Sequence, residues 1–305
     1  MKQFIYFLFA FSLVFTSCSK TKKESTKESL KIVTTTGMIG DALKNIVGDK
    51  AEVISLMGVG VDPHLYKATP SDLKALREAD IIFYNGLHLE GNMAEVLEKL
   101  SKRKAVFALA DGLSKEELRS SNDGSTVHDP HIWFNVALWS KGIQYASEQL
   151  IQAAPEQSSF YQANTQQYLQ ELAALHTWVG EEIQKIPVER RVLITAHDAF
   201  GYFGDAYAIE VRGLQGISTV AEVGLRDVTI LVKYIVEKKI KAVFVESSIP
   251  KKALEAVVSG CQQKKHTIEI GGVLYSDAMG AANTPSGTYI GMVKSNVNTI
   301  VDALK

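Results

Sequence analysis

Short apolar, β-branched segments alternate with amphipathic segments along most of the chain. Apolar runs of four to seven residues are typical of buried strands, and apolar residues at helical spacing predict helices. The predicted strands cover 31–36, 51–57, 81–84, 105–108, 191–195, 242–245 and 267–270. The predicted helices cover 38–47, 71–79, 93–100, 199–207, 226–238, 250–264 and 288–304. This alternation predicts an α/β fold with mostly parallel sheets, arranged as two similar halves.

The two halves are separated by a long stretch, 155–187, with apolar residues at helical spacing and no proline in its interior. About 30 helical residues would span roughly 45 Å, the size of a whole domain. The stretch therefore predicts a stiff linking helix between an N-terminal domain at 31–154 and a C-terminal domain at 188–305. Two shorter helices broken near Gly180 are the alternative.

The first thirty residues have a different pattern. One lysine precedes an apolar run, Phe4 to Phe15, which is broken only by Ser12 and is shorter than the roughly 20 residues needed to cross a bilayer. The pattern predicts a signal peptide at 1–17. Thr16-Ser17-Cys18 resembles the lipobox of bacterial lipoproteins, with Phe15 where that motif usually has Leu. We expect a lipidated Cys18 followed by a polar tether at 18–30, and an incidental cysteine is the alternative.

Composition and charge narrow the classes of function. The chain has 305 residues and a formal net charge of −1, which gives no electrostatic reason to expect nucleic-acid binding. Its 2 cysteines cannot build a disulfide framework or a four-cysteine metal site. Any metal chemistry would therefore depend on histidine and carboxylate side chains.

Four polar residues stand in surroundings that indicate metal ligands. They are His64 in VDPHLY, His131 in HDPHIW, His197 in TAHDAF directly after a predicted strand, and Asp277 in YSDAMG. Ligands of open α/β sheets bind beyond the carboxyl ends of the strands, and three imidazoles with one carboxylate suit Zn²⁺ or Mn²⁺. A histidine after a strand can also be structural, and Asp-Pro-His can be only a turn, so the residues alone leave both readings open.

The order of these motifs along the chain resembles one known family. DPHLY, IIFYNGLHLE, DPHIWFNV, the long helical stretch, LITAHDAFGYFGDAYAIEV and YSDAMG follow one another as in the TroA-like (cluster A-I) substrate-binding proteins of zinc and manganese ABC transporters. The resemblance extends from about residue 31 to residue 305. It implies two α/β domains joined by one long backbone helix, with a metal in the cleft between them. The ligands it implies are His64, His131, His197 and Asp277.

The resemblance also implies a function. The chain would be an extracytoplasmic lipoprotein, monomeric and not an enzyme, anchored on the periplasmic or extracellular face of the cell membrane. It would capture Zn²⁺ or Mn²⁺ and deliver the ion to an ABC permease. A zinc hydrolase and a metal-dependent adhesin are the alternatives, although the sequence has no His-Glu-x-x-His signature.

The choice of metal depends on His197, because manganese-dedicated members usually carry Glu at that position. Imidazole suits Zn²⁺ better than Mn²⁺, so zinc is favoured over manganese. Against this, the segment 114–127 lacks the histidines of the loop found in many zinc-dedicated members. Glu222 and Glu246 are expected in loops near the cleft, where they could support the ligands, and Trp133 with Phe134 is expected to pack the floor of the site.

Overall fold

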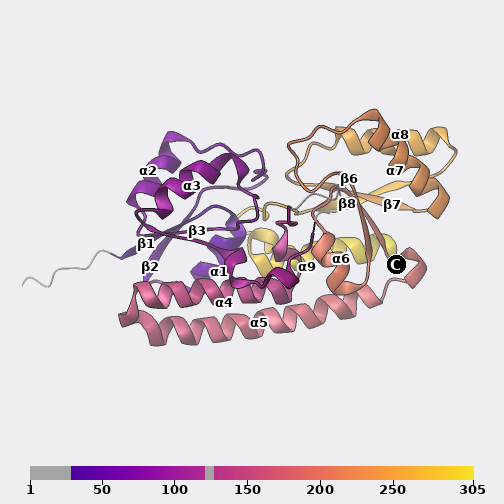
Figure 1. The fold of residues 1–305 in the computed structure, drawn as a ribbon. Helices are drawn as coiled ribbons and strands as arrows, with labels where there is room; N and C mark the ends of the chain where they lie inside the picture. Colours follow the sequence, from indigo (N-terminus) through magenta and orange to yellow (C-terminus); the bar gives the residue numbers. More distant parts are fainter. Residues whose placement is uncertain (1–28, 121–126) are drawn as a thin grey trace, which may run out of the picture.

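The computed structural model describes residues 29–120 and 127–305, and it consists of two α/β halves lying on a layer of long helices (Figure 1). The predicted signal peptide, Cys18 and most of the predicted tether lie outside the described residues. In the N-terminal half, parallel strands are arranged in the order β2-β1-β3-β4. Their bounds are β1 (Leu30–Thr34), β2 (Ala51–Ser55), β3 (Ile81–Tyr84) and β4 (Ala105–Ala108).

Helices cover both faces of this sheet (Figure 1). They are α1 (Gly37–Val47), α2 (Pro70–Glu78) and α3 (Ala94–Ser101). Successive residues of a strand point to opposite faces, so Ile82 packs with the residues of α2 and α3, whereas Ile81 and Phe83 pack on the α1 side. Burial on both faces explains why β3 is a continuous apolar run.

The C-terminal half is also built from parallel strands and helices, but its strands form two separate pairs. Strands β5 (Val192–His197) and β6 (Glu210–Gln215) pair in parallel, as do β7 (Ala242–Glu246) and β8 (Glu269–Leu274), and β5 packs beside β7. Its helices are α6 (Gly201–Tyr207), α7 (Leu225–Lys238), α8 (Lys252–Gln263) and α9 (Tyr289–Leu304). Helices α7 and α8 share an apolar core with one face of these strands.

One helix, α5 (Ser158–Gln184), runs beneath both halves (Figure 1). Its 27 residues span about 40 Å, and it contacts α1 and α4 (Val136–Ala153) of the first half and α6 and α9 of the second. The break considered near Gly180 does not occur. The predicted fold class, α/β with mostly parallel sheets joined by one long helix, is confirmed.

Two elements are not predicted by the sequence pattern. One is helix α4, although Trp139, Ile143 and Leu150 lie on one buried face and Asn135 caps its first turn. Strand β6 was also missed. In addition, β8 lies further along the chain than the predicted 267–270, and β1 begins at Leu30, inside the range predicted for the tether. The domain boundaries themselves stay a prediction.

The two halves are joined by a shared apolar core at their base. The ring of Phe134, from the first half, stacks on Phe200 of the second at 4.1 Å between centroids. Tyr289 stacks on Trp139 and donates a hydrogen bond from its hydroxyl to the carbonyl of Trp133, at 2.7 Å. Because all of these side chains are buried, the base of the molecule is a close-packed apolar contact between the two halves. In the described ranges, no helix combines the length and apolar character needed to cross a membrane.

Candidate metal centre

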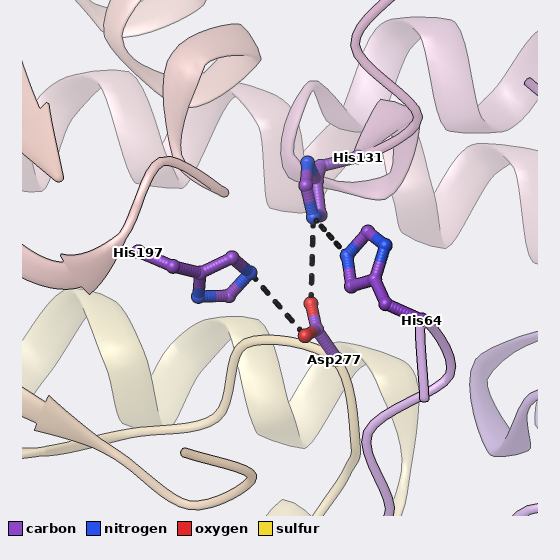
Figure 2. A group of neighbouring side chains, drawn as sticks. All are labelled: His64, His131, His197 and Asp277. Atoms are coloured by element: carbon purple, nitrogen blue, oxygen red, sulfur yellow. Dashed lines mark hydrogen bonds and ion pairs between the residues drawn. The ribbon is translucent and has the colours of Figure 1, made fainter. Parts of the chain in front are cut away.

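The four predicted ligands, distant in sequence, come together between the two halves (Figure 2). His64 lies in the loop after β2, and His131 immediately precedes the short 3₁₀ helix η4 (Ile132–Phe134). His197 is the last residue of β5, and Asp277 follows β8. Three of the four therefore lie at the carboxyl ends of parallel strands, as the sheet topology predicts. All four side chains are buried, with at most 3% of any residue exposed.

The distances between the four side chains match those of a metal site. Nε2 of His64 lies 3.3 Å from Nε2 of His131, which lies 3.6 Å from Oδ1 of Asp277. Oδ2 of Asp277 lies 3.3 Å from Nε2 of His197. A tetrahedral zinc ion bound at about 2.0–2.1 Å sets its donor atoms roughly 3.3–3.4 Å apart. One atom from each residue can be chosen so that all four lie within 4.8 Å of one another.

Several of these donor atoms have no hydrogen-bond partner. Among the described residues, Nε2 of His197 and both carboxylate oxygens of Asp277 are buried without one, and their only close polar contacts are the ion pairs within the cluster. An unpartnered polar atom in a protein interior is destabilising because it has lost its water. A cation bound at this point would satisfy all three atoms at once.

Two further carboxylates orient the imidazoles. Oδ1 of Asp129 lies 2.7 Å from Nδ1 of His131, and Oε2 of Glu246 lies 2.5 Å from Nδ1 of His197. A carboxylate that accepts a proton from Nδ1 fixes the tautomer in which Nε2 has its lone pair free for a metal. Glu246 thus supports a ligand as expected, but its predicted place in a loop was wrong, because it is the last residue of β7. Glu222 is exposed.

The two Asp-Pro-His segments form the same local turn. The backbone N–H of His64 donates to Oδ1 of Asp62 at 2.9 Å, and that of His131 donates to Oδ1 of Asp129 at 3.0 Å. An aspartate that accepts from the backbone two residues later is a common turn-forming arrangement. This role of the aspartates is not among the sequence predictions, although the repetition of Asp-Pro-His was a usable signal.

Burial and mutual attraction shift the protonation of the site. Burial lowers the pKa of His64 to about 3, so this ring is neutral. Burial also disfavours the charged form of His197, but Glu246 and Asp277 outweigh it and hold the pKa of His197 well above its usual value. Burial raises the pKa of Asp277, but the nearby imidazoles, His197 foremost, bring it well below its usual range. Without a cation, the site therefore keeps a proton on His197 next to ionised Asp277.

Trp133 forms the floor of the site, as expected. Its ring meets that of His131 edge-on at 5.2 Å, and its Nε1–H donates to the carbonyl of Ser276 at 3.0 Å. The ring of Phe134 packs against that of Trp133, with 5.8 Å between the centroids. The indole therefore fixes the backbone next to Asp277 and closes one side of the site to water.

Two α/β halves on a rigid helix, with a buried cluster of three imidazoles and a carboxylate between them, define the class of cluster A-I metal-binding substrate-binding proteins. The model of one family, described as zinc-uptake complex component A, periplasmic (ZnuA), matches residues 32–303. The chain belongs to this family, whose members are solute-binding proteins of transporters and not enzymes.

Individual relatives cover almost the whole chain. It is 48% identical to the manganese-binding lipoprotein MntA of Bacillus subtilis over 282 residues, 92% of each chain. It is 46% identical to the zinc-binding protein TroA of Treponema pallidum over 273 residues, 90% of this chain and 88% of that one. The solved structure of the Treponema pallidum periplasmic zinc-binding protein TroA superposes with a TM-score of 0.88, covering 90% of this chain and 99% of the other.

Proposed function

We propose that this protein captures a divalent metal ion between its two halves and delivers it to an ABC-type importer. The observation that carries the proposal is the convergence of His64, His131, His197 and Asp277, which are buried and include donor atoms without partners. All four protein ligands are present in this arrangement, so a tetrahedral shell would be filled without a water that could attack a substrate. A filled shell suits a carrier better than a hydrolase.

We further propose that zinc is favoured over manganese. Three imidazoles and one carboxylate form a borderline-soft donor set, whereas Mn²⁺ prefers oxygen donors. The names of the relatives do not support this preference, because the relative at 48% identity and several at 31–32% are named for manganese, whereas one at 46% is named for zinc. The donor chemistry of His197 is therefore the argument for zinc.

The proposed location follows from the N-terminal sequence. Export through a signal peptide at 1–17 and lipid attachment at Cys18 would hold the folded part outside the cytoplasm, as a monomer on the membrane that carries the permease. Relatives such as MntA of Bacillus subtilis are named as lipoproteins, which supports this part of the proposal.

Elemental analysis tests the proposed cargo. Metal-stripped protein is equilibrated with equal concentrations of zinc and manganese, desalted and analysed, and we expect one ion per chain with zinc in excess. His131→Ala should abolish retention, whereas His88→Ala, at an exposed loop histidine, should not. A protein that retains neither metal would contradict capture, and an excess of manganese would contradict the metal preference.

Uptake by cells tests delivery. In a strain lacking this gene, the wild-type protein should restore accumulation of the metal at low external concentration, and His64→Ala should not. Equal accumulation with the two proteins would contradict the carrier role.

A further inference from the structure

A hydrogen bond connects the two halves close to the metal centre. The hydroxyl of Thr219, in the loop after β6, donates to Oδ2 of Asp62 at 2.6 Å. Asp62 lies in the first half, two residues before His64, and Thr219 is only 8% exposed. Close by, Gly60 has φ +68, and a Cβ at that position would lie 3.4 Å from the carbonyl oxygen of Ser247 in the second half. The two loops therefore meet between the halves beside His64, and we call this contact the mouth.

Both ends of this hydrogen bond are tied to proposed metal ligands. On one side, Oδ1 of Asp62 accepts the backbone N–H of His64 at 2.9 Å. On the other side, the Nε2 amide of Gln215 donates to the carbonyl of Thr219 at 2.8 Å. Gln215 is the register partner of His197 across β5 and β6. One connected path thus runs from His64 through Asp62, Thr219 and Gln215 to the strand end that carries His197.

The contacts between the two halves are of different kinds at the mouth and at the base. At the base, buried aromatic rings of both halves interlock, so separating the halves there would expose core side chains to water. At the mouth, the apolar neighbours Val59, Leu65 and Val220 are already 59%, 50% and 65% exposed. Parting the loops would add little new apolar exposure, so polar contacts decide whether the mouth stays closed over His64.

We propose that Asp62 and Thr219 form a clasp that positions His64 and slows the release of the bound cation. The proposal rests on the proposed function, because it assigns these two residues to retention of that cargo. Asp62 is a positioning residue in this scheme, since it acts through the backbone of His64 and does not touch the ion. One carboxylate oxygen of Asp62 accepts the backbone N–H of His64, and the other accepts the hydroxyl of Thr219 in the opposite half.

Replacement of one hydroxyl tests the clasp. Thr219→Val keeps the shape of the side chain and removes the donor, and its matched control is Thr229→Val, whose hydroxyl donates only within α7, to the carbonyl of Leu225. With excess chelator as trap, we expect zinc to dissociate roughly tenfold faster from Thr219→Val, the size expected for one hydrogen bond to a charged acceptor. The rate of zinc association should not change.

A conservative variant separates positioning from simple loss of structure. In Asp62→Asn, the amide oxygen can still accept from His64 and the amide N–H can donate to Thr219, so dissociation should stay close to wild type. Asp62→Ala loses both contacts and should release zinc at least as fast as Thr219→Val. Adding Thr219→Val to Asp62→Ala should then cause no further acceleration.

Amide hydrogen exchange provides a readout that needs no metal. In the metal-free protein, exchange in the segment 216–223 should be faster in Thr219→Val than in wild type or Thr229→Val. Dissociation and exchange both at wild-type rates would overturn the clasp. If wild-type protein bound no metal, the proposed function would fail, and the exchange measurement alone would decide whether the clasp exists.

Discussion

Glu246 holds His197 by two atoms at once. One carboxylate oxygen accepts from the backbone nitrogen of His197 at 2.9 Å, and the other lies 2.5 Å from Nδ1 of its ring. Glu246 ends β7 and His197 ends the neighbouring strand β5, so the packing of these two strands against each other brings the pair together. Asp129 holds His131 in the same two-point manner, through a single oxygen. Two of the three imidazoles are therefore oriented before any cation arrives.

These two contacts predict that zinc affinity falls when the carboxylate of Glu246 is replaced by an amide. Glu246→Gln keeps the size of the side chain but leaves one acceptor for two N–H donors. We expect zinc affinity to fall roughly 10- to 100-fold, the usual effect of losing a carboxylate behind a metal-binding histidine. Competition titration against a chromophoric chelator measures the change. Glu222→Gln, at an exposed position, is the control, and equal affinities for the two variants would refute the orienting role.

The raised pKa of His197 predicts that metal binding releases a proton. Since Glu246 and Asp277 hold that pKa well above its usual value despite burial, the metal-free ring is protonated at neutral pH. The ion must displace this proton, so apparent affinity should rise with pH by up to about tenfold per unit while the pH stays below that pKa. Calorimetry in buffers of different ionisation enthalpy counts the protons. Fewer should be released by Glu246→Gln, and a pH-independent affinity in the wild type would contradict the assignment.

Replacing His197 with Glu should shift metal preference. The substitution exchanges an imidazole for a carboxylate, which hard Mn²⁺ accepts more readily than Zn²⁺ does. We expect the ratio of bound manganese to bound zinc to increase in competition binding followed by elemental analysis. His88→Glu adds the same charge at an exposed loop position and should leave the ratio unchanged. An unchanged ratio in His197→Glu would remove the donor argument for zinc.

Two glycines should respond oppositely to alanine. A Cβ at Gly201 would lie 2.4 Å from Nε of Arg119 and 2.8 Å from Oδ2 of Asp129, so Gly201→Ala should destabilise the protein by about 1–3 kcal/mol. Gly180 lies inside α5 with open space around that position, so Gly180→Ala should stabilise it by about 0.5–1 kcal/mol. Denaturant unfolding of the metal-free proteins measures both. A stabilising Gly201→Ala would contradict the crowding next to Arg119, and a destabilising Gly180→Ala would contradict the open space at that position.

The lipid anchor makes a separate prediction. Cys18→Ser removes the thiol to which lipid would be attached, so the variant should appear in the soluble fraction after cell lysis and ultracentrifugation, while wild type sediments with membranes. Cys261→Ser, at a buried cysteine of α8, should sediment like wild type and serves as the control. Continued sedimentation of Cys18→Ser would refute anchoring through this residue.

Where local sequence carried the information, prediction from the sequence succeeded. The strand Ile81–Tyr84 is buried on both faces and reads as a bare apolar run, and α5 keeps one buried face through 27 residues. Strand β6 was missed because Glu210 and Arg212 are exposed at an edge, so it lacks such a run. Gly213 in β6 approaches Asp198 so closely that a Cβ would lie 2.4 Å from its backbone nitrogen. The need for glycine at this position comes from the residue that follows β5, and the hydrophobic pattern around Gly213 does not indicate it.

The sequence by itself determined the kinds of donor atom and their order along the chain, because an imidazole or a carboxylate is a property of one residue. Only the tertiary structure decided their distances, their protonation and their supports. Asp62 meets Thr219 across 157 residues, and His197 meets Glu246 across 49. The burial that lowers the pKa of His64 to about 3 comes from segments of both halves packed around it. Coordination distances, pKa values and the clasp all depend on which distant groups share the space, and that is fixed only when the halves pack together.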